Sequence, residues 1–292
     1  MLKVVCFGEV LWDVFPTEKK IGGAPLNVAL RLQSFGNDVS MISAVGNDTD
    51  GQNIIEYLSD SGIDTALIPL ISNESTSHVN VQLDKNGSAK YTIEMPCAWD
   101  FIELNDAIIN KVKSSDAFIF GSLTARMPTS YKTLSQILES ATLKVFDVNL
   151  RPPHYTIDKL LSFMCKADII KFNDEELLEL SRKFGSGTNS LIDNVKFISE
   201  RTNTQQICVT LGSNGALLYI EGVVYRSRGY EVKVEDTVGA GDSFLATLVN
   251  GLLKDENPQV ILEKACAIGA LVASRKGANP ILKESDITNL IS

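Results

Sequence analysis

Short apolar runs alternate with amphipathic segments along most of this chain, and this alternation is the feature that most constrains its fold. The runs are short and often rich in β-branched residues, which favours buried strands, whereas the segments between them carry apolar residues at helical spacing. Such alternation predicts an α/β layer structure. We expect strands at 2–7, 39–45, 66–70, 118–121, 144–148, 168–172, 206–211 and 216–220, and helices at 26–35, 50–59, 128–140, 243–253 and 258–274.

Residues 78–95 depart from this rhythm. Val79, Val81 and Leu83 alternate with polar residues, Asn86-Gly87 supplies a turn, and apolar residues alternate again on the way back. This pattern predicts a hairpin with one apolar and one polar face. The apolar face has to be buried, either against the rest of the same domain or at an interface.

The segment Asp236–Phe244, with the sequence DTVGAGDSF, carries the clearest chemical signal. The small residues at its centre let backbone N–H groups approach an anion closely. A helix is expected to follow, so these residues lie at a helix N-terminus, where unpaired N–H groups and the helix dipole attract negative charge. Asp242 in the first turn is then either an N-terminal cap or a base aimed at a nucleophile.

The composition limits the class of partner. The chain has 292 residues and a formal net charge of −9, without a cluster of Lys and Arg, which argues against nucleic acid or an anionic membrane as a partner. The five cysteines show neither a zinc pattern nor a disulfide framework, so we expect reduced thiols in a cytoplasmic protein. The first residues resemble neither a signal peptide nor a membrane span.

Polar residues follow the strand expected at 144–148. Asp147, Asn149 and Arg151 alternate, so in an extended segment they point to the same side. The carboxyl edge of a parallel sheet is where ligands bind in such folds. Arg151 therefore contacts a ligand or holds the loop through Asp147.

A capping pattern opens the helix that is expected after 168–172. Asn173 is a plausible N-cap, and Glu176 stands three residues later, which predicts a capping box. Because Mg²⁺ keeps several of its waters, one glutamate is also chemically sufficient to hold it. The two roles are compatible, since capping fixes the glutamate.

Two of these segments resemble the signatures of the ribokinase, or PfkB, family of carbohydrate kinases. The segment at 236–244 resembles the C-terminal signature of the family, and Gly22–Asn27 (GGAPLN) resembles the N-terminal one. The resemblance implies a ribokinase-like three-layer α/β/α sandwich with a central, mostly parallel sheet. It also implies one kinase domain over 1–292, with a small β-sheet lid formed by about 10–22 and 70–100 that pairs with its copy in a homodimer.

The resemblance further implies ATP-dependent transfer of a phosphoryl group to a primary hydroxyl of a monosaccharide. Asp242 would be the base, and the backbone of Gly239, Ala240 and Gly241 would stabilise the developing charge. The sugar would bind to Asp13, Gly22, Gly23, Asn27, Asn149 and Arg151. ATP would bind to Lys171, Asn173, Thr210, Gly212, Gly215, Gly239, Gly241, Gly277 and Asn279. Lys276 is either a further cation for the phosphates or, as its position after a helix favours, a solvated helix end. Glu176 would hold Mg²⁺ through water, and Asp236 would lie near a monovalent cation such as K⁺.

The choice of sugar rests on smaller details. Gly8-Glu9, Asp13, the GGAPLN stretch at 22–27 and the DVNLRP stretch at 147–152 together resemble fructokinases most, so fructose is the expected substrate. The hairpin region departs from that pattern, with Ser88-Ala89-Lys90 where many fructokinases have an Arg and Pro96–Asp100 (PCAWD) where they have Pro-Gly-Ala-Asp.

Other functions stay open. Ribokinase or 2-keto-3-deoxygluconate kinase activity is the nearest alternative, and a catalytically silent sugar-binding sensor of the same fold is an alternative of another class. A Rossmann-fold oxidoreductase and a P-loop kinase are disfavoured, because neither G-x-G-x-x-G nor G-x-x-x-x-G-K-[ST] is present.

Overall fold

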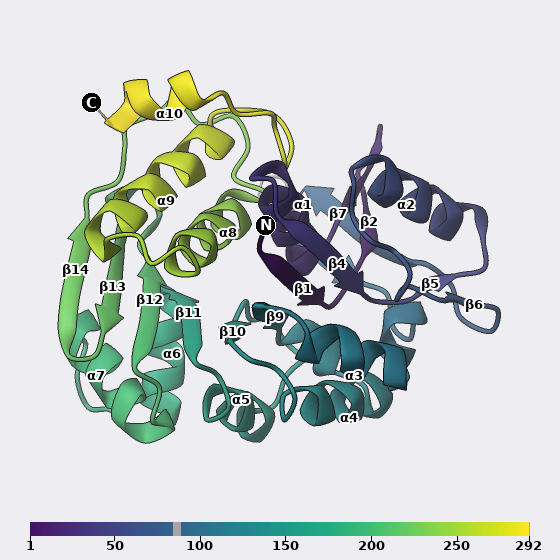
Figure 1. Ribbon diagram of the computed structural model, residues 1–292, viewed down its shortest axis with the longest axis horizontal. Helices are drawn as coiled ribbons and strands as arrows, with labels where there is room; N and C mark the ends of the chain where they lie inside the picture. Colours follow the sequence, from purple (N-terminus) through teal and green to yellow (C-terminus); the bar gives the residue numbers. More distant parts are fainter. Residues whose placement is uncertain (84–88, 292) are drawn as a thin grey trace.

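The computed structural model describes residues 1–83 and 89–291. Within this part of the chain, one sheet of eight strands forms the centre of the molecule (Figure 1). Its strands lie in the order β14 (Val223–Ser227), β13 (Ala216–Ile220), β12 (Gln206–Thr210), β11 (Ile169–Asn173), β10 (Lys144–Asp147), β9 (Ala117–Gly121), β1 (Lys3–Phe7) and β4 (Asp38–Ile42). The strands from β4 to β12 pair in parallel, and β13 and β14 add an antiparallel edge.

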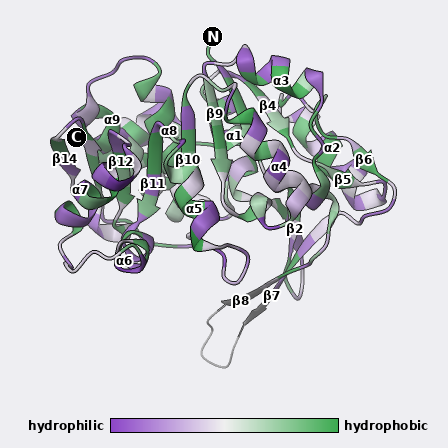
Figure 2. Ribbon diagram, turned by 90° about the horizontal axis from the view of Figure 1, so that it is seen from below, coloured by the Kyte–Doolittle hydropathy of each residue, from purple (hydrophilic) through white to green (hydrophobic). Residues whose placement is uncertain are grey.

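A second, smaller sheet projects from one side of the molecule (Figure 2). It contains β3 (Lys19–Gly22), β2 (Leu11–Val14), β7 (Ser77–Leu83) and β8 (Ala89–Ile93). Strands β7 and β8 form the expected hairpin, whose predicted turn at Asn86-Gly87 lies outside the described residues, as does Ser88. The very short strands β5 (Val45–Gly46) and β6 (Leu70–Ile71) pair with each other nearby.

Helices cover both faces of the large sheet and complete the three expected layers (Figure 1). One face carries α1 (Ala24–Ser34), α2 (Thr49–Asp60), α8 (Ala240–Leu252) and α9 (Pro258–Ala273), and α10 (Glu284–Ile291) packs outside α9. The other face carries α3 (Asp106–Lys113), α4 (Pro128–Ile137), α5 (Ile157–Met164), α6 (Asp174–Lys183) and α7 (Leu191–Thr202). None of the helices in the described part is long and apolar enough to cross a membrane.

The large sheet is apolar on both faces because helices cover both of them. On β10, for example, Val145 packs in the layer of α1 and α8, whereas Phe146 packs in the opposite layer. Phe146 stacks there on Phe120 of β9, with ring centroids 5.0 Å apart. The near-continuous apolar runs read from the sequence are thus the strands of a doubly covered sheet.

Two details of the expected strand pattern are wrong. The strand expected at 66–70 is reduced to Leu70–Ile71, because Ile68 donates its N–H to Thr65 O in a turn and Pro69 has no N–H to offer a ladder. The strand expected at 39–45 divides into β4, which ends at Ile42, and β5, which begins at Val45.

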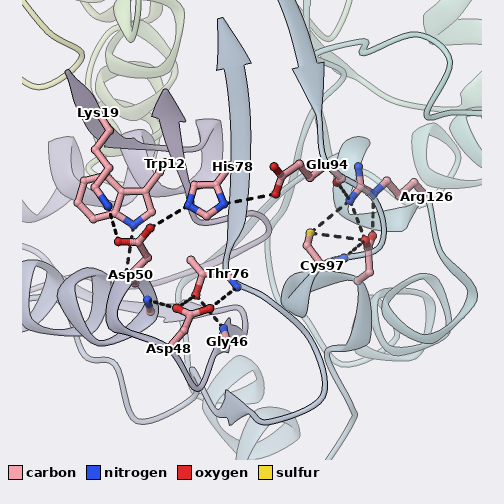
Figure 3. Close-up of polar contacts among 12 residues, drawn as sticks. Trp12, Lys19, Gly46, Asp48, Asp50, Thr76, His78, Glu94, Cys97 and Arg126 are labelled. Carbon is pink, nitrogen blue, oxygen red and sulfur yellow. Dashed lines mark hydrogen bonds and ion pairs between the residues drawn. The ribbon is translucent and has the colours of Figure 1, made fainter. Parts of the chain in front are cut away.

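A buried ion pair fastens the end of the small sheet to the body of the molecule (Figure 3). Asp100, in the 3₁₀ turn η1 (Ala98–Phe101), accepts hydrogen bonds at 2.7 Å from Nε and Nη2 of Arg126, and neither side chain is more than 1% exposed. Arg126 also donates to the main-chain oxygen of Glu94, the residue after β8. Its guanidinium lies 4.0 Å from the centroid of the Trp99 ring.

We therefore predict that Asp100→Asn lowers the free energy of unfolding by about 3–5 kcal/mol, because it leaves the Arg126 cation buried without a counter-charge. Urea denaturation measures this change. Glu139→Gln is the control, because it removes the same kind of charge from an exposed ion pair with Lys166, and it should leave the unfolding midpoint almost unchanged. An equal shift in the two variants would contradict the prediction.

Candidate active site

The candidate site residues gather at one edge of the large sheet. Glu9, Asp147, Asn173 and Thr210 lie at or just after the carboxyl ends of β1, β10, β11 and β12. The parallel pairing of these strands brings their carboxyl ends to the same edge, and helix α8 begins beside them. This is where open α/β sheets bind ligands.

Gly239 makes the turn into α8 and is its N-cap, with φ of 77°. A Cβ there would come within 2.4 Å of Ala278 O, so only glycine fits both the backbone conformation and the close approach of the two loops. The N–H groups of Gly241 and Asp242 have no acceptor in the described part of the chain. Ala240 N donates to Thr237 O at 3.3 Å, so this one of the expected anion-binding N–H groups is already used.

Asp242 lies half-buried in the first turn of α8 and belongs to a chain of side-chain hydrogen bonds. Asn27 of α1 donates from Nδ2 to Asp242 Oδ2 at 2.8 Å, and Asn279 donates from Nδ2 to Asn27 Oδ1 at 2.9 Å. The N-terminal and C-terminal signatures therefore meet at this carboxylate. Burial, followed by the like charge of Asp147, raises the pKa of Asp242 to about 7.

Lys171 is the buried cation of the site. Its Nζ lies 3.0 Å from Oδ1 of Asp147, and the two side chains are 9% and 6% exposed. Burial alone would lower the pKa of Lys171, but the carboxylates of Asp147 and Glu176 raise it above its usual value, so the ammonium stays charged. This charge in turn lowers the pKa of Asp242, against the effect of burial.

Glu176 forms the predicted capping box with Asn173 at the start of α6. One carboxylate oxygen accepts from Asn173 N at 2.8 Å, and the other accepts from Leu150 N at 2.8 Å. Each oxygen keeps a lone pair, which suits contact with the hydration shell of Mg²⁺ better than a protein cage. Among residues 1–83 and 89–291, no group of three or more His, Cys, Asp or Glu side chains is placed to hold a metal.

Asp13 and the glycine pair meet at the small sheet. Gly22 pairs with Leu11, beside Asp13, and a Cβ on Gly22 would come 2.4 Å from Asp13 Oδ2. Gly23 is the N-cap of α1 at φ 121° and lies against the main chain of Glu9. Burial raises the pKa of Asp13 to about 6, although the charge of Arg151 lowers it. The glycines thus leave one face of this carboxylate clear.

The segment that follows β10 differs from the expected extended chain. Asn149 has φ of 36°, which turns the backbone and ends the simple alternation of side chains. The suggested pair between Asp147 and Arg151 is wrong, because Asp147 pairs with Lys171 and Arg151 donates from Nη1 to Leu150 O. Arg151 is exposed, and its charge still acts on Asp13 and Asp242.

A cavity of about 550 Å³ lies beside the start of α8. Of the residues expected to bind ATP, Thr210, Gly212, Gly215 and Gly241 line it. Five others do not line it: Lys171, Asn173, Gly239, Gly277 and Asn279. Lys276 is also absent from its lining and is exposed.

Part of the wall of this cavity consists of residues that were not expected from the sequence. Tyr230, Val232 and Val234 follow β14, and Gly269 and Ala270 come from α9. The available signal was the apolar character of 230–234 outside any expected strand, since Val234 is 60% exposed and does not serve the core.

Asp236 joins the two loops that border this region. Its carboxylate accepts from Val238 N at 3.0 Å and from Gly277 N at 3.3 Å. This clamp gives Asp236 and Gly277 a structural role, and the carboxylate retains lone pairs for a cation.

The small sheet is held on the large domain through Asp50 at the start of α2 (Figure 3). Lys19 of β3 donates to one oxygen of its carboxylate, and Nε2 of His78, on β7, lies 2.8 Å from the other. Trp12 of β2 donates from Nε1 to Asp50 O at 3.2 Å. Three strands of the small sheet therefore contact one helix N-terminus.

Comparison with known proteins gives the class that this fold and site define. The model of the pfkB family of carbohydrate kinases matches residues 1–285. A sugar kinase of Pyrococcus horikoshii is 33% identical over 279 residues, covering 92% of this chain and 85% of its own length. Fructokinase-1 of Zea mays is 28% identical over 318 residues, covering 99% of this chain and 97% of its own.

Solved structures agree with this assignment. The crystal structure of an uncharacterized sugar kinase from P. horikoshii in complex with ATP has a TM-score of 0.81 at 29% identity and covers both chains completely. Fructokinase from Vibrio cholerae, in a form with fructose, ADP and calcium ion bound, has a TM-score of 0.84 at 25% identity and covers 100% of this chain and 99% of its own. The chain belongs to the PfkB family of carbohydrate kinases, which are phosphotransferases that act on a sugar hydroxyl.

The raised pKa values of two carboxyl groups predict the acid limb of the pH profile. Both groups are protonated below their pKa and ionised above it, so kcat/KM should fall about tenfold per pH unit below 7 if Asp242 acts as a base. The slope should steepen below 6, where Asp13 also becomes protonated. Initial rates between pH 5 and 9 check this, and a profile that stays flat down to pH 5 would contradict it.

Proposed function

We propose that this protein is an ATP-dependent fructokinase that transfers the γ-phosphoryl group of ATP to a primary hydroxyl of fructose. The observation that carries the proposal is Asp242, held by Asn27 next to unused backbone N–H groups. A carboxylate beside an anion-binding turn suits the attack of an alcohol on a phosphate. The cavity at Gly241, lined by residues of α8, α9 and the loops after β12 and β14, is suited to the nucleotide.

The reaction would then proceed in one displacement. The oxygen of the sugar hydroxyl attacks the γ-phosphorus, the bond to the β-phosphate oxygen breaks, and ADP leaves. Asp242 accepts the hydroxyl proton in the transition state. A pKa near 7 suits this role, because the group is ionised in about half of the molecules at neutral pH and is still basic enough to take a proton.

Charge on the transferring group is stabilised by the N–H groups of Gly241 and Asp242 and by the Lys171 ammonium behind them. A Cβ on Gly241 would lie 3.6 Å from Lys171 Nζ, so the turn and the ammonium are close neighbours. Mg²⁺, when bound, would neutralise charge on the phosphates, with Glu176 as a contact through water. The Asp236 carboxylate, which accepts hydrogen bonds from Val238 N and Gly277 N, would use its remaining lone pairs to contribute to the binding of K⁺.

Fructose is favoured by the relatives and by the sugar side of the site. The Z. mays relative is named a fructokinase, and the V. cholerae fructokinase has been crystallised with fructose and ADP bound. A double mutant of the latter also holds a potassium ion. Asp13 can accept from two neighbouring hydroxyls, and the charge of Arg151 acts on it. Asn27 contacts Asp242 instead, so it lies at the transfer end of the proposed site. We further propose that the small sheet pairs with its copy in a homodimer to form a lid over the sugar, and that the protein is cytoplasmic.

The role of the base is tested by Asp242→Asn, which keeps the size of the side chain and removes its basicity. We expect kcat to fall by about 10²–10⁴, with nucleotide affinity and melting temperature nearly unchanged. Asp193→Asn, at an exposed position in α7, is the matched control and should keep full activity. Turnover retained in the Asp242 variant would remove this mechanism.

The substrate is tested by ATP consumption with fructose, ribose and 2-keto-3-deoxygluconate in the presence of Mg²⁺ and K⁺. We expect the highest kcat/KM with fructose. Dominant turnover of another sugar would keep the mechanism and refute the fructose assignment. Thermal stabilisation by a sugar without turnover of any would support a silent sugar-binding sensor instead.

A further inference from the structure

A second cavity, of about 700 Å³, lies between α1, α8, the segment 279–282 and α10. It shares no lining residue with the cavity beside Gly241. In Figure 1 the chain between α9 and α10 passes from the C-terminal helices towards α1 and returns to α10. Apart from Asn279, none of the residues proposed for the phosphoryl transfer or for the binding of its two substrates lines this space.

The lining of this cavity is positively charged although the whole chain is acidic. Arg31, Lys254 and Lys264 line it, with Glu284 as the one carboxylate among the lining residues of the described chain. Within residues 1–83 and 89–291, none of the three cations forms an ion pair. The lining therefore carries two more positive than negative charges, although the whole protein has a net charge of −9, and this local positive charge would attract an anion.

Arg31 is the central cation, and it is only 3% exposed. Its Nε donates to Ser243 Oγ at 3.1 Å, and its Nη2 donates to Pro280 O at 3.0 Å. Both partners are neutral, and Nη1 has no acceptor among the described residues. Arg31 lies in the last turn of α1, where the helix dipole supplies only about half of a negative elementary charge against the charge of the guanidinium. A buried guanidinium in these surroundings is stabilised by an anionic ligand.

Two uncharged residues of the lining also lack partners. Gln33 and Asn279 each hold a buried side-chain carbonyl oxygen that has no hydrogen-bond donor within the described chain. Such oxygens accept hydrogen bonds from hydroxyl groups. Phe35 and Tyr57 add aromatic surface at the same cavity. The lining therefore offers cations for an anion and acceptors for hydroxyls.

We infer that this cavity is a regulatory site for a phosphate ester of a small polyol, the chemical class of the sugar phosphate that the kinase forms. The phosphate would meet Arg31, Lys254 and Lys264, and the hydroxyls would meet Gln33 and Asn279 once these side chains turn their buried oxygens towards the cavity. A volume of about 700 Å³ accommodates a hexose phosphate with room for water. The choice of ligand rests on the function proposed above, whereas the presence of an anion-binding site is inferred from the lining residues alone.

The site is joined to the catalytic carboxylate by two short connections. Arg31 donates to Ser243, the residue after Asp242. Asn279 donates to Asn27, which donates to Asp242. A ligand that engages Arg31 and Asn279 would alter the hydrogen bonds around Asp242, and its negative charge would oppose ionisation of that carboxylate. Binding should therefore lower kcat.

The test reverses two charges of the cavity that are remote from the machinery. Lys254→Glu/Lys264→Glu is compared by titration calorimetry with the wild type and with Lys132→Glu/Lys196→Glu, which reverses two exposed lysines on other helices that form no ion pair in the described chain. Fructose 6-phosphate and inorganic phosphate are the probes. The wild type and the control should bind two equivalents of fructose 6-phosphate, and the cavity variant should bind one.

The stoichiometry separates the two proposals. If only the proposed function fails, the wild type binds one equivalent, and the cavity variant loses it. If the cavity does not bind the ligand, the cavity variant binds as the wild type does, which overturns the inference. If inorganic phosphate and fructose 6-phosphate bind to the cavity with equal affinity, the free anion is the ligand, which overturns the choice of a phosphate ester. Affinity for fructose 6-phosphate at least tenfold higher than for inorganic phosphate supports the ester.

The kinetic readout tests the coupling. At saturating ATP and sugar, fructose 6-phosphate should lower kcat of the wild type and of the lysine control at least twofold, and it should leave kcat of the cavity variant unchanged. The basal kcat of the cavity variant should equal that of the wild type. Inhibition that saturating substrates remove completely from the wild type would show that the ester acts at the active site alone and would overturn the coupling.

Discussion

The buried ammonium of Lys171 is the interaction on which the carboxyl edge of the large sheet depends. It pairs with Asp147 of the neighbouring strand and lies close enough to Glu176 and Asp242 for each carboxylate to raise its pKa. Carboxylates gathered at the end of a parallel sheet would otherwise repel one another in a poorly solvated place. One cation on β11 therefore lets a strand, a capped helix and the glycine turn before α8 converge, and the missing side chain of Gly241 gives it room.

The balance of these charges also sets the chemistry. Burial and Asp147 favour the protonated form of Asp242, whereas Lys171 and the amide of Asn27 favour the ionised form. The result is a carboxyl group poised near neutral pH at the end of a cavity large enough for a nucleotide. In the proposed function, sugar specificity would have a separate origin, in Asp13 and the small sheet, which Asp50 anchors to the large domain. Transfer chemistry and substrate choice would then be built on different elements.

The layers, the hairpin and the N-terminus of α8 could be predicted from the sequence, because local periodicity and glycine conformation determine them. The expected strand at 66–70 failed because a turn at Thr65–Ile68 and the missing N–H of Pro69 prevail over apolar composition. The alternation from Asp147 to Arg151 failed at Asn149, because asparagine adopts positive φ more readily than most residues and does so here. The partners of Lys171 and Arg31 come from distant segments, so no local pattern could reveal them.

The central claim, that the surroundings of Asp242 place its ionisation near neutral pH, can be measured directly. Carbon-13 NMR of protein with labelled aspartate side chains follows each carboxyl group, and the signal that disappears in Asp242→Asn belongs to this residue. The account predicts that this signal titrates with a pKa of about 7 in the free protein. A pKa near the ordinary value of 3.8 would show that Asp242 is fully ionised and only a weak base at neutral pH, and would contradict the account.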